Sequence, residues 1–387
     1  MNFDLTPEQR QLVDTIRDFC AREIAPRARA WDDEERFPHE IVPRLAELNL
    51  LGLFAEEEYG GAGMSMLEYT LVIEELARAD GSICLTVASH NSLCTGHIRL
   101  AGTPEQKQRY VPRLARGEAL GAFALTEPDS GSDAGSLRTT ATPDGDGWTL
   151  NGSKQWITNG SYAGTFLLFA RTDPEAAGAR GVSAFLLDPE HVRVTREEEK
   201  LGINSSSTAD LALDGARVGP DRLLHELNRG FAVAMATLDG GRIGIAAQAV
   251  GIAQAAFEAA RGYALERRQF GRRISEFQAI QWKLADMATE LDAARLLVYR
   301  AAWRKQQGLS HAAEGAKAKL FASEMARRQT AEAIQILGGY GYTKEFPVER
   351  YYRDAKITEI YEGTSEVQRI VIARELLGRL EAAQPAR

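Results

Sequence analysis

The chain has 387 residues, of which 44% are hydrophobic and 26% are charged, and its formal net charge is −8. This composition is typical of a folded globular protein and excludes intrinsic disorder, and the acidic balance argues against a general nucleic-acid binder, which needs a basic face. Because single hydrophobic cores usually stop growing at about 250–300 residues, two or three domains are expected.

The sequence predicts neither a membrane span nor an export signal. No run of about 18 consecutive apolar residues occurs, and Met1-Asn2-Phe3-Asp4 lacks a basic and then apolar leader. We therefore expect a cytoplasmic protein. The three cysteines and six histidines are scattered and form no ligand-spaced cluster, so no metal site is predicted.

The first third of the chain predicts helices. Thr6 and Thr103 each precede a proline, and a glutamine follows three residues later, which is the pattern of a helix N-cap with proline at the first helical position. Pro26 is expected to end or kink the first helix. Between the two start signals, the apolar spacing predicts helices over 66–78 and 82–100.

From about Gly121 the pattern changes to short strands separated by turns. Pro, Asp, Asn and Gly cluster between the apolar runs, for example at 143–147 and at Asn151-Gly152. No helix long enough for a parallel crossover lies among them, so we expect an antiparallel barrel or sandwich. The predicted strands cover residues 121–125, 148–150, 154–157, 165–170, 182–187, 192–195 and 211–213.

Long helices return after Gly230. Residues 274–307 contain neither glycine nor proline, and apolar side chains recur at alternating spacings of three and four, which predicts a seam between antiparallel helices. At about 1.5 Å per residue this helix would span about 50 Å, so it either packs within its own chain or also forms a subunit interface. The seam comprises Phe277, Ile280, Leu284, Met287, Leu291, Ala294, Val298 and Ala301.

Common signatures of nucleotide binding and hydrolysis are missing, since the sequence has no GxGxxG between a strand and a helix, no GxxxxGK[ST], no GxSxG and no HExxH. Three other segments carry candidate chemistry. FALTEPDSGSDAG (123–135) is a polar loop that follows a strand. In KQWITNG (154–160), Trp156 and Thr158 share a strand face and could stack on and hydrogen-bond to a planar ring.

The third segment, IYEGTSEVQR (360–369), holds Glu362 in a glycine-containing loop, with Thr364 as a possible helix N-cap. Desolvation of a carboxylate raises its pKa toward the range useful for a general base. Each segment also has an ordinary interpretation: a polar surface loop, a tryptophan in the sheet core, and a solvated glutamate.

Together these segments resemble the acyl-CoA dehydrogenase family. LTEPDSGSD, WITNG and GGYGYTKEFPVERYYRDAKITEIYEGTSEVQR occur in the order and at the spacing of that family, with LDGGRIGIAAQAVGIAQ and ERRQFG between them. The resemblance runs nearly the whole chain and implies an α+β multidomain fold. Its parts would be an N-terminal α-helical domain (1–120), a middle antiparallel β-barrel or sandwich domain (121–228) and a C-terminal four-helix bundle (229–387).

The resemblance also implies FAD as cofactor, an acyl-CoA substrate, electron-transfer flavoprotein as acceptor, and a homotetramer built as a dimer of dimers. Glu362 matches the catalytic base, which takes the α-proton while hydride leaves the β-carbon for flavin N5, giving a trans-2-enoyl-CoA. Substrate contacts are implied for Ser132, Asp239, Arg242, Tyr361 and Gly363.

Flavin contacts are implied in three groups of residues. The first lies along the β-domain: Phe123, Leu125, Thr126, Ser132, Trp156, Ile157 and Thr158. The second would reach the FAD of a neighbouring subunit, partly at its adenine-diphosphate end: Arg267, Gln269, Phe270, Gln278, Gln335 and Gly339. The third follows the catalytic loop: Thr364 and Glu366.

The resemblance leaves the substrate open. Gly241 stands where isovaleryl- and long-chain-type members carry their base, which favours a short- or medium-chain pattern with Glu362 alone. The sequence is most like butyryl-CoA dehydrogenases, and medium-chain, 2-methyl-branched, cyclic or aryl acyl-CoA substrates are alternatives. Two other functions stay open: a flavin-free scaffold with the same fold, and an acyl-CoA oxidase, although such oxidases are usually longer.

Overall fold

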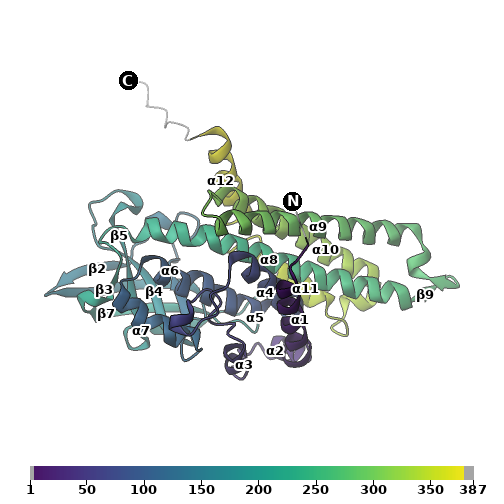
Figure 1. Cartoon of the computed structure of the whole chain (residues 1–387), viewed down its shortest axis with the longest axis horizontal. Coiled ribbons are helices and arrows are strands. Elements are labelled where there is room, and N and C mark those ends of the chain that lie inside the picture. Colours follow the sequence, from purple (N-terminus) through teal and green to yellow (C-terminus); the bar gives the residue numbers. More distant parts are fainter. Residues whose placement is uncertain (1–3, 379–387) are drawn as a thin grey trace.

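The computed structural model describes residues 4–378, which form a helical part, a β-sheet and a long helical bundle in that order (Figure 1). This confirms the fold class expected from the sequence. Met1, Asn2 and Phe3, on which the expectation of a missing leader rests, lie outside the described residues, as does the end of the chain after Gly378.

The N-terminal part is helical, and both predicted helix starts are confirmed. Thr6 Oγ1 accepts a hydrogen bond from Gln9 N at 3.2 Å, while Gln9 Oε1 accepts one from Thr6 N at 3.1 Å. Thr103 and Gln106 form the same reciprocal pair. The helices are α1 (Pro7–Phe19), α2 (Ala28–Asp33), α3 (Ile41–Glu47), α4 (Met66–Ala79), α5 (Gly81–Ser89), α6 (Gly96–Ala101) and α7 (Pro104–Ala115).

The helix predicted over 82–100 is confirmed, and it contains a π-helical turn (His90–Thr95) between α5 and α6. His90, which is fully buried in this turn, joins two other elements. Its Nε2 lies 2.9 Å from Leu51 O, and its Nδ1 accepts a hydrogen bond from Gly121 N at 2.9 Å. The turn thereby fixes the helical part to the first strand of the sheet.

The middle part is one eight-stranded sheet in the order β6-β7-β3-β2-β4-β5-β8, with β1 also paired to β4. β1 runs parallel to β4, with Phe123 opposite Leu167, so the expectation of a wholly antiparallel sheet was wrong. The β2–β3 hairpin makes the crossover, and no helix is needed. The strands are β1 (Leu120–Ala124), β2 (Thr140–Asp144), β3 (Gly147–Thr158), β4 (Ala163–Arg171), β5 (Val182–Leu187), β6 (Arg193–Glu197), β7 (Thr208–Val218) and β8 (Leu223–Leu224).

The turn predicted at Asn151-Gly152 was also wrong, since both residues lie inside the 12-residue strand β3. Thr139 explains the glycine: a Cβ on Gly152 would lie 2.5 Å from Thr139 Oγ1, and φ there is +148°. A close approach between two chain segments therefore requires the glycine that the sequence pattern assigned to a turn.

The C-terminal part is a helical bundle built around α8 (Gly230–Glu266), a 37-residue helix that packs against α4 and α10. Among the described helices, α8 is the one long and apolar enough to cross a membrane, but 78% of its apolar window is buried inside the protein. Its companions are α9 (Gln278–Gln306), α10 (Ala312–Leu337), α11 (Val348–Ile357) and α12 (Ser365–Leu377), and the hairpin β9 (Arg268–Gln269)–β10 (Arg272–Arg273) joins α8 to α9.

The predicted seam on α9 is confirmed, with a shift at its start. Residues 274–276 form a 3-10 turn, so the helix begins at Gln278. The later seam positions, from Met287 onward, are buried, and the earlier ones are half-buried. Two tryptophans of the same helix, Trp282 and Trp303, are 60% and 51% exposed, so α9 also presents an apolar outer face.

Candidate active site

Glu362 lies in the short connection between α11 and α12, where the backbone is left-handed. The φ angle is +51° at Glu362 and +93° at Gly363. Thr364 ends this connection as the N-cap of α12, and its Oγ1 accepts a hydrogen bond from Val367 N at 3.3 Å. This cap was predicted from the sequence.

The Glu362 carboxylate lies against α8 at Gly241, because a Cβ on Gly241 would be only 2.1 Å from Glu362 Oε2. That oxygen is buried and accepts no hydrogen bond from the described residues. Burial disfavours an unpaired charge and raises the pKa of Glu362 to about 7. Three cations act in the opposite direction: Lys319, Arg242 and Lys305. A carboxylate with this pKa can accept a proton near neutral pH.

Arg242 and Asp239, two predicted substrate contacts, lie one turn apart on α8 and next to Gly241. Arg242 Nη1 donates to Asp239 Oδ1 at 2.5 Å, whereas Arg242 Nε is buried and has no hydrogen-bond partner in the part of the chain that the structure describes. A buried donor without a partner in the protein calls for an explanation, and a ligand supplies one. The substrate role of both residues stays a prediction.

Tyr361, the residue before the candidate base, is held at a second point of α8, two turns after Gly241 on the same face. Its hydroxyl donates to Gln248 Oε1, and Gln248 Nε2 donates to Gly81 O at 2.9 Å. A second tyrosine, Tyr69 of α4, approaches Gly244 so closely that a Cβ there would lie 2.6 Å from the phenol oxygen. The glycines of α8 thus make room for side chains that reach the helix from α4 and from the Glu362 loop.

The polar loop that follows β1 lies beside β3. Gln155 N donates to Thr126 O at 2.9 Å, which joins the loop to the strand. Leu125 is buried, Phe123 and Thr126 are half-buried, and Ser132 is exposed. The structure therefore brings Thr126 next to the Trp156 segment and leaves Ser132 further out on the loop.

Trp156 interrupts the regular pairing of β3. The register with β7 shifts between Lys154 and Ile157, and φ at Trp156 is +57°. Trp156 is 57% exposed, whereas Ile157 belongs to the sheet core. Trp156 is therefore not a core residue, which removes the ordinary interpretation of this segment, and its ring stays free for a ligand. Thr158 is half-buried.

Sequence reasoning missed a buried ion pair at the base of the same loop. Lys154 Nζ donates to Glu127 Oε1 at 2.7 Å, and both side chains are almost completely buried. Glu127 also accepts hydrogen bonds from Arg138 N at 2.6 Å and from Thr139 N at 3.0 Å. The sequence offered one clue to this pair: each of the two candidate binding segments, 123–135 and 154–160, contains one of its charged residues, Glu127 and Lys154 respectively.

The second group of predicted flavin contacts lies at the other end of the molecule. Arg267, Gln269 and Gly339 line a pocket of about 640 Å³ near the β9–β10 hairpin, and Phe270 in that hairpin is 93% exposed. Gln278, Gln335 and Glu366 are exposed, and Thr364 is half-buried.

α8 separates the two groups. It begins against β5, where a Cβ on Gly230 would lie 2.4 Å from Ala184 N, and its 37 residues carry the chain about 55 Å to the hairpin. The strands and β9 accordingly lie at opposite ends of the view in Figure 1. Arg267, directly after the end of α8, therefore lies at the end of the bundle away from β5.

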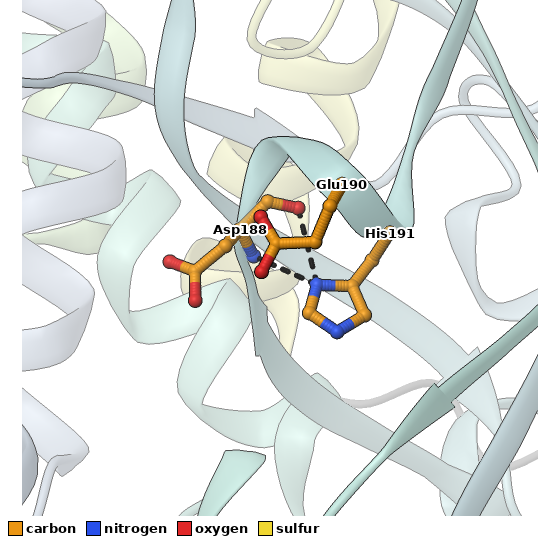
Figure 2. Close-up of side chains that lie close together, drawn as sticks. All are labelled: Asp188, Glu190 and His191. Carbon is orange, nitrogen blue, oxygen red and sulfur yellow. Dashed lines mark hydrogen bonds between the residues drawn. The ribbon is translucent and has the colours of Figure 1, made fainter.

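One group of side chains has the composition of a metal site: Asp188, Glu190 and His191 (Figure 2). However, Asp188 Oδ2 is paired with Arg222 at 2.7 Å, and His191 Nδ1 lies against the backbone of Asp188, 3.2 Å from its carbonyl oxygen. These contacts already explain the group as structural, and it carries no argument for a metal.

Comparison with known proteins agrees with this three-part fold. Family models described as the N-terminal, middle and C-terminal domains of acyl-CoA dehydrogenase match residues 6–118, 122–216 and 228–377. The chain is 47% identical to a short-chain specific acyl-CoA dehydrogenase of Clostridium acetobutylicum, over 97% of this chain and 100% of that protein. It is 49% identical to the mitochondrial short-chain specific acyl-CoA dehydrogenase of Bos taurus, over 96% of this chain and 90% of that one.

Solved structures give the same result. Butyryl-CoA dehydrogenase from Megasphaera elsdenii superimposes with a TM-score of 0.95 at 44% identity, covering 97% of this chain and all of that one. A chain from a study of the electron transferring flavoprotein of Acidaminococcus fermentans superimposes with a TM-score of 0.96 at 46% identity, covering 98% of this chain and all of that one. Fold and likeness thus define an oxidoreductase that acts on CH–CH bonds. The chain belongs to the acyl-CoA dehydrogenase family and is an acyl-CoA dehydrogenase.

Proposed function

We propose that this protein is an FAD-dependent dehydrogenase of short-chain acyl-CoA thioesters, with butyryl-CoA as its typical substrate. The observation that carries the proposal is the Glu362 carboxylate, which faces Gly241 and has a pKa of about 7, and whose buried Oε2 has no hydrogen-bond partner among residues 4–378. The short-chain preference is supported by the likeness to the short-chain enzymes of C. acetobutylicum and B. taurus.

The residues present fit FAD. The exposed ring of Trp156 offers a stacking surface, and Thr158 lies on the same strand. At the far end of the bundle, the pocket lined by Arg267, Gln269 and Gly339 would hold the adenine-diphosphate end of a neighbouring subunit's cofactor. Bound FAD supplies the acceptor for the hydride that leaves the β-carbon.

The chain's own residues carry the proton chemistry. Glu362 takes the α-proton, and the electron pair of that C–H bond becomes part of the new Cα=Cβ double bond as hydride leaves the β-carbon. The backbone N–H of Glu362 makes no hydrogen bond within residues 4–378, so it can donate to the thioester oxygen. Negative charge develops on that oxygen as the proton leaves, and a pre-placed donor stabilises it.

The same proposal includes the assembly and the electron acceptor. Because the second group of flavin contacts lies at the far end of the bundle, beyond the end of α8, we infer that a second copy of the chain completes the cofactor site. The exposed Phe270 and the tryptophans of α9 are the surfaces expected to be covered in a homotetramer built as a dimer of dimers. We further propose that the electrons pass to an electron-transfer flavoprotein, and that the domains span 1–120, 121–228 and 229–387.

The test is anaerobic reduction by butyryl-CoA. The purified protein should be yellow, and butyryl-CoA should bleach its flavin absorbance. Glu362→Gln should keep its FAD and bleach at least about 10³-fold more slowly, within the usual range for loss of a general base. Glu199→Gln, at an exposed position outside the candidate site, is the matched control and should behave like the wild type.

Other outcomes would point elsewhere. Undiminished bleaching by Glu362→Gln would remove Glu362 as the base. A colourless protein that releases no flavin on denaturation would favour the scaffold, and peroxide formation with oxygen as sole acceptor would favour an oxidase. A panel of straight C4 to C16 and branched acyl-CoA substrates fixes the chain length.

A further inference from the structure

The loop that carries Glu362 is held in a backbone conformation that costs energy. Glu362 has φ +51° and the following Gly363 has φ +93°. A non-glycine residue in the left-handed region is strained and persists only when its surroundings over-determine it. The contacts that hold this loop are therefore part of what places the carboxylate.

Two buried donors converge on one carbonyl of this loop. Lys319 Nζ of α10 and Gln368 Nε2 of α12 each lie 2.7 Å from Gly363 O. Both residues are completely buried. Gly363 is thus tied to two helices that approach it from different parts of the bundle.

A salt bridge does not account for the burial of Lys319. Among the described residues it forms no ion pair within 4.0 Å, although a buried ammonium group is costly without one. Its hydrogen bond goes to the residue next to the candidate base, and its charge is the first of those that oppose the effect of burial on Glu362. A role in stabilising the ionised Glu362 carboxylate would explain why Lys319 is buried at this position.

Other charged and titratable groups around Glu362 come from each element that packs against its loop. They are Arg242 of α8, Lys305 of α9, and the buried phenols Tyr69 of α4 and Tyr361 of the loop. Glu359 of the connection and Glu366 of α12 also act on the charge of Lys319. Of the three cations, Lys319 is the one that also hydrogen-bonds the catalytic loop.

We propose that Lys319 is a positioning residue for α-proton abstraction, which holds the Gly363 carbonyl so that Glu362 meets the substrate and stabilises the ionised carboxylate with its charge. This inference rests on the proposed role of Glu362. Gln368 shares the first task, because it donates to the same carbonyl, but it carries no charge and cannot perform the second.

The experiment compares three variants of the FAD-loaded protein by the pH dependence of flavin bleaching with butyryl-CoA. Lys319→Met removes both the donor and the charge. It should slow bleaching by about 10²-fold, as expected for a misplaced catalytic group. It should also move the ascending limb of the pH profile up by about one pH unit, because the lost positive charge no longer lowers the pKa of the Glu362 carboxylate. Gln368→Leu should slow bleaching without moving the limb.

Lys317→Met is the matched control, since Lys317 lies two residues away on α10 and points to the other side of the helix. It should change neither the rate nor the profile. A Lys319→Met protein with wild-type rate and an unmoved limb would overturn the proposal. If that variant does not accumulate in the FAD-loaded form, Lys319→Gln takes its place, and an unmoved limb in that variant overturns the electrostatic role just as directly.

Failure of this proposal is distinguishable from failure of the proposed function. The wild type and Glu362→Gln are measured in the same assay. If the limb is present in the wild type and bleaching is lost in Glu362→Gln, the base is established whatever Lys319→Met does. A purely structural lysine would lower the yield or the stability of the protein but would leave the position of the limb unchanged.

Discussion

Glu127 and Glu362 are both buried carboxylates, and the chain treats them in opposite ways. Burial would raise the pKa of Glu127, but the Lys154 charge and the donated hydrogen bonds hold it below its usual value. Glu362 accepts no hydrogen bond at Oε2 from any residue between 4 and 378, and burial raises its pKa to about 7. The comparison teaches that the donors around a buried carboxylate, more than its burial, separate a structural role from a chemical one.

The largest effect on stability is expected at the paired site, which is the buried Glu127–Lys154 ion pair. Lys154→Met leaves Glu127 buried without its cation, which should lower the free energy of unfolding by about 3–5 kcal/mol. Denaturant unfolding of the FAD-loaded protein measures this. The double variant Glu127→Gln/Lys154→Met should lose less than the sum of the two single variants, since it no longer leaves a charge alone. A Lys154→Met loss below about 1 kcal/mol would contradict the comparison.

At the unpaired site, which is Glu362, a substitution should change the rate of flavin bleaching rather than the stability of the fold. Gly241→Ala places a methyl group where Glu362 Oε2 now lies, since the added Cβ would be 2.1 Å from that oxygen. The carboxylate must move, and bleaching by butyryl-CoA should slow by about 10²-fold, or about 2.7 kcal/mol of barrier. Gly262→Ala on the same helix, where nothing lies within 4 Å of the added Cβ, should keep the wild-type rate.

The sequence predicted the unpaired site better than the paired one. Glu362 and Thr364 stand in a glycine-containing loop before a helix, and the N-cap that this pattern predicts is present. Glu127 and Lys154 were not singled out, because charged residues in a polar loop and on a strand are usually solvated. Their burial depends on the pairing of two segments 27 residues apart, which no local pattern records.

The same limit explains the errors in the fold. The helix–sheet–helix order follows from periodicity, and it is confirmed. The parallel pairing of β1 with β4 and the position of Gly152 inside β3 depend on which distant segment lies alongside. The position of Arg267 at the far end of the bundle likewise follows from the length of α8, which only the folded chain displays.

The pH dependence of stability sharpens the comparison. In the folded protein the pKa of Glu362 is about 7, above its ordinary value of 4.5, so the folded state holds this proton more tightly than the unfolded state. Its contribution to stability is complete below pH 4.5 and is lost as the pH rises through 7. Relative to the wild type, Glu362→Gln should therefore gain about 2 kcal/mol between pH 5 and pH 8. An equal offset at both pH values would show that the carboxylate is not perturbed.

The smallest effect is expected at a third carboxylate. Asp129 lies two residues after Glu127 and pairs with Arg138 at 2.8 Å, but the two side chains are 68% and 77% exposed. Asp129→Ala should change the free energy of unfolding by less than about 0.5 kcal/mol. A larger loss would mean that the loop is stabilised by charge in general rather than by the buried pair.

The length of α8 has a consequence for how the protein keeps its cofactor. If the flavin stacked on Trp156 of one chain is held by Arg267 of another, release of FAD and separation of the subunits are linked equilibria. Dilution should then turn yellow protein into colourless protein, and added FAD should drive reassembly. The colour of a diluted sample would report on its quaternary structure.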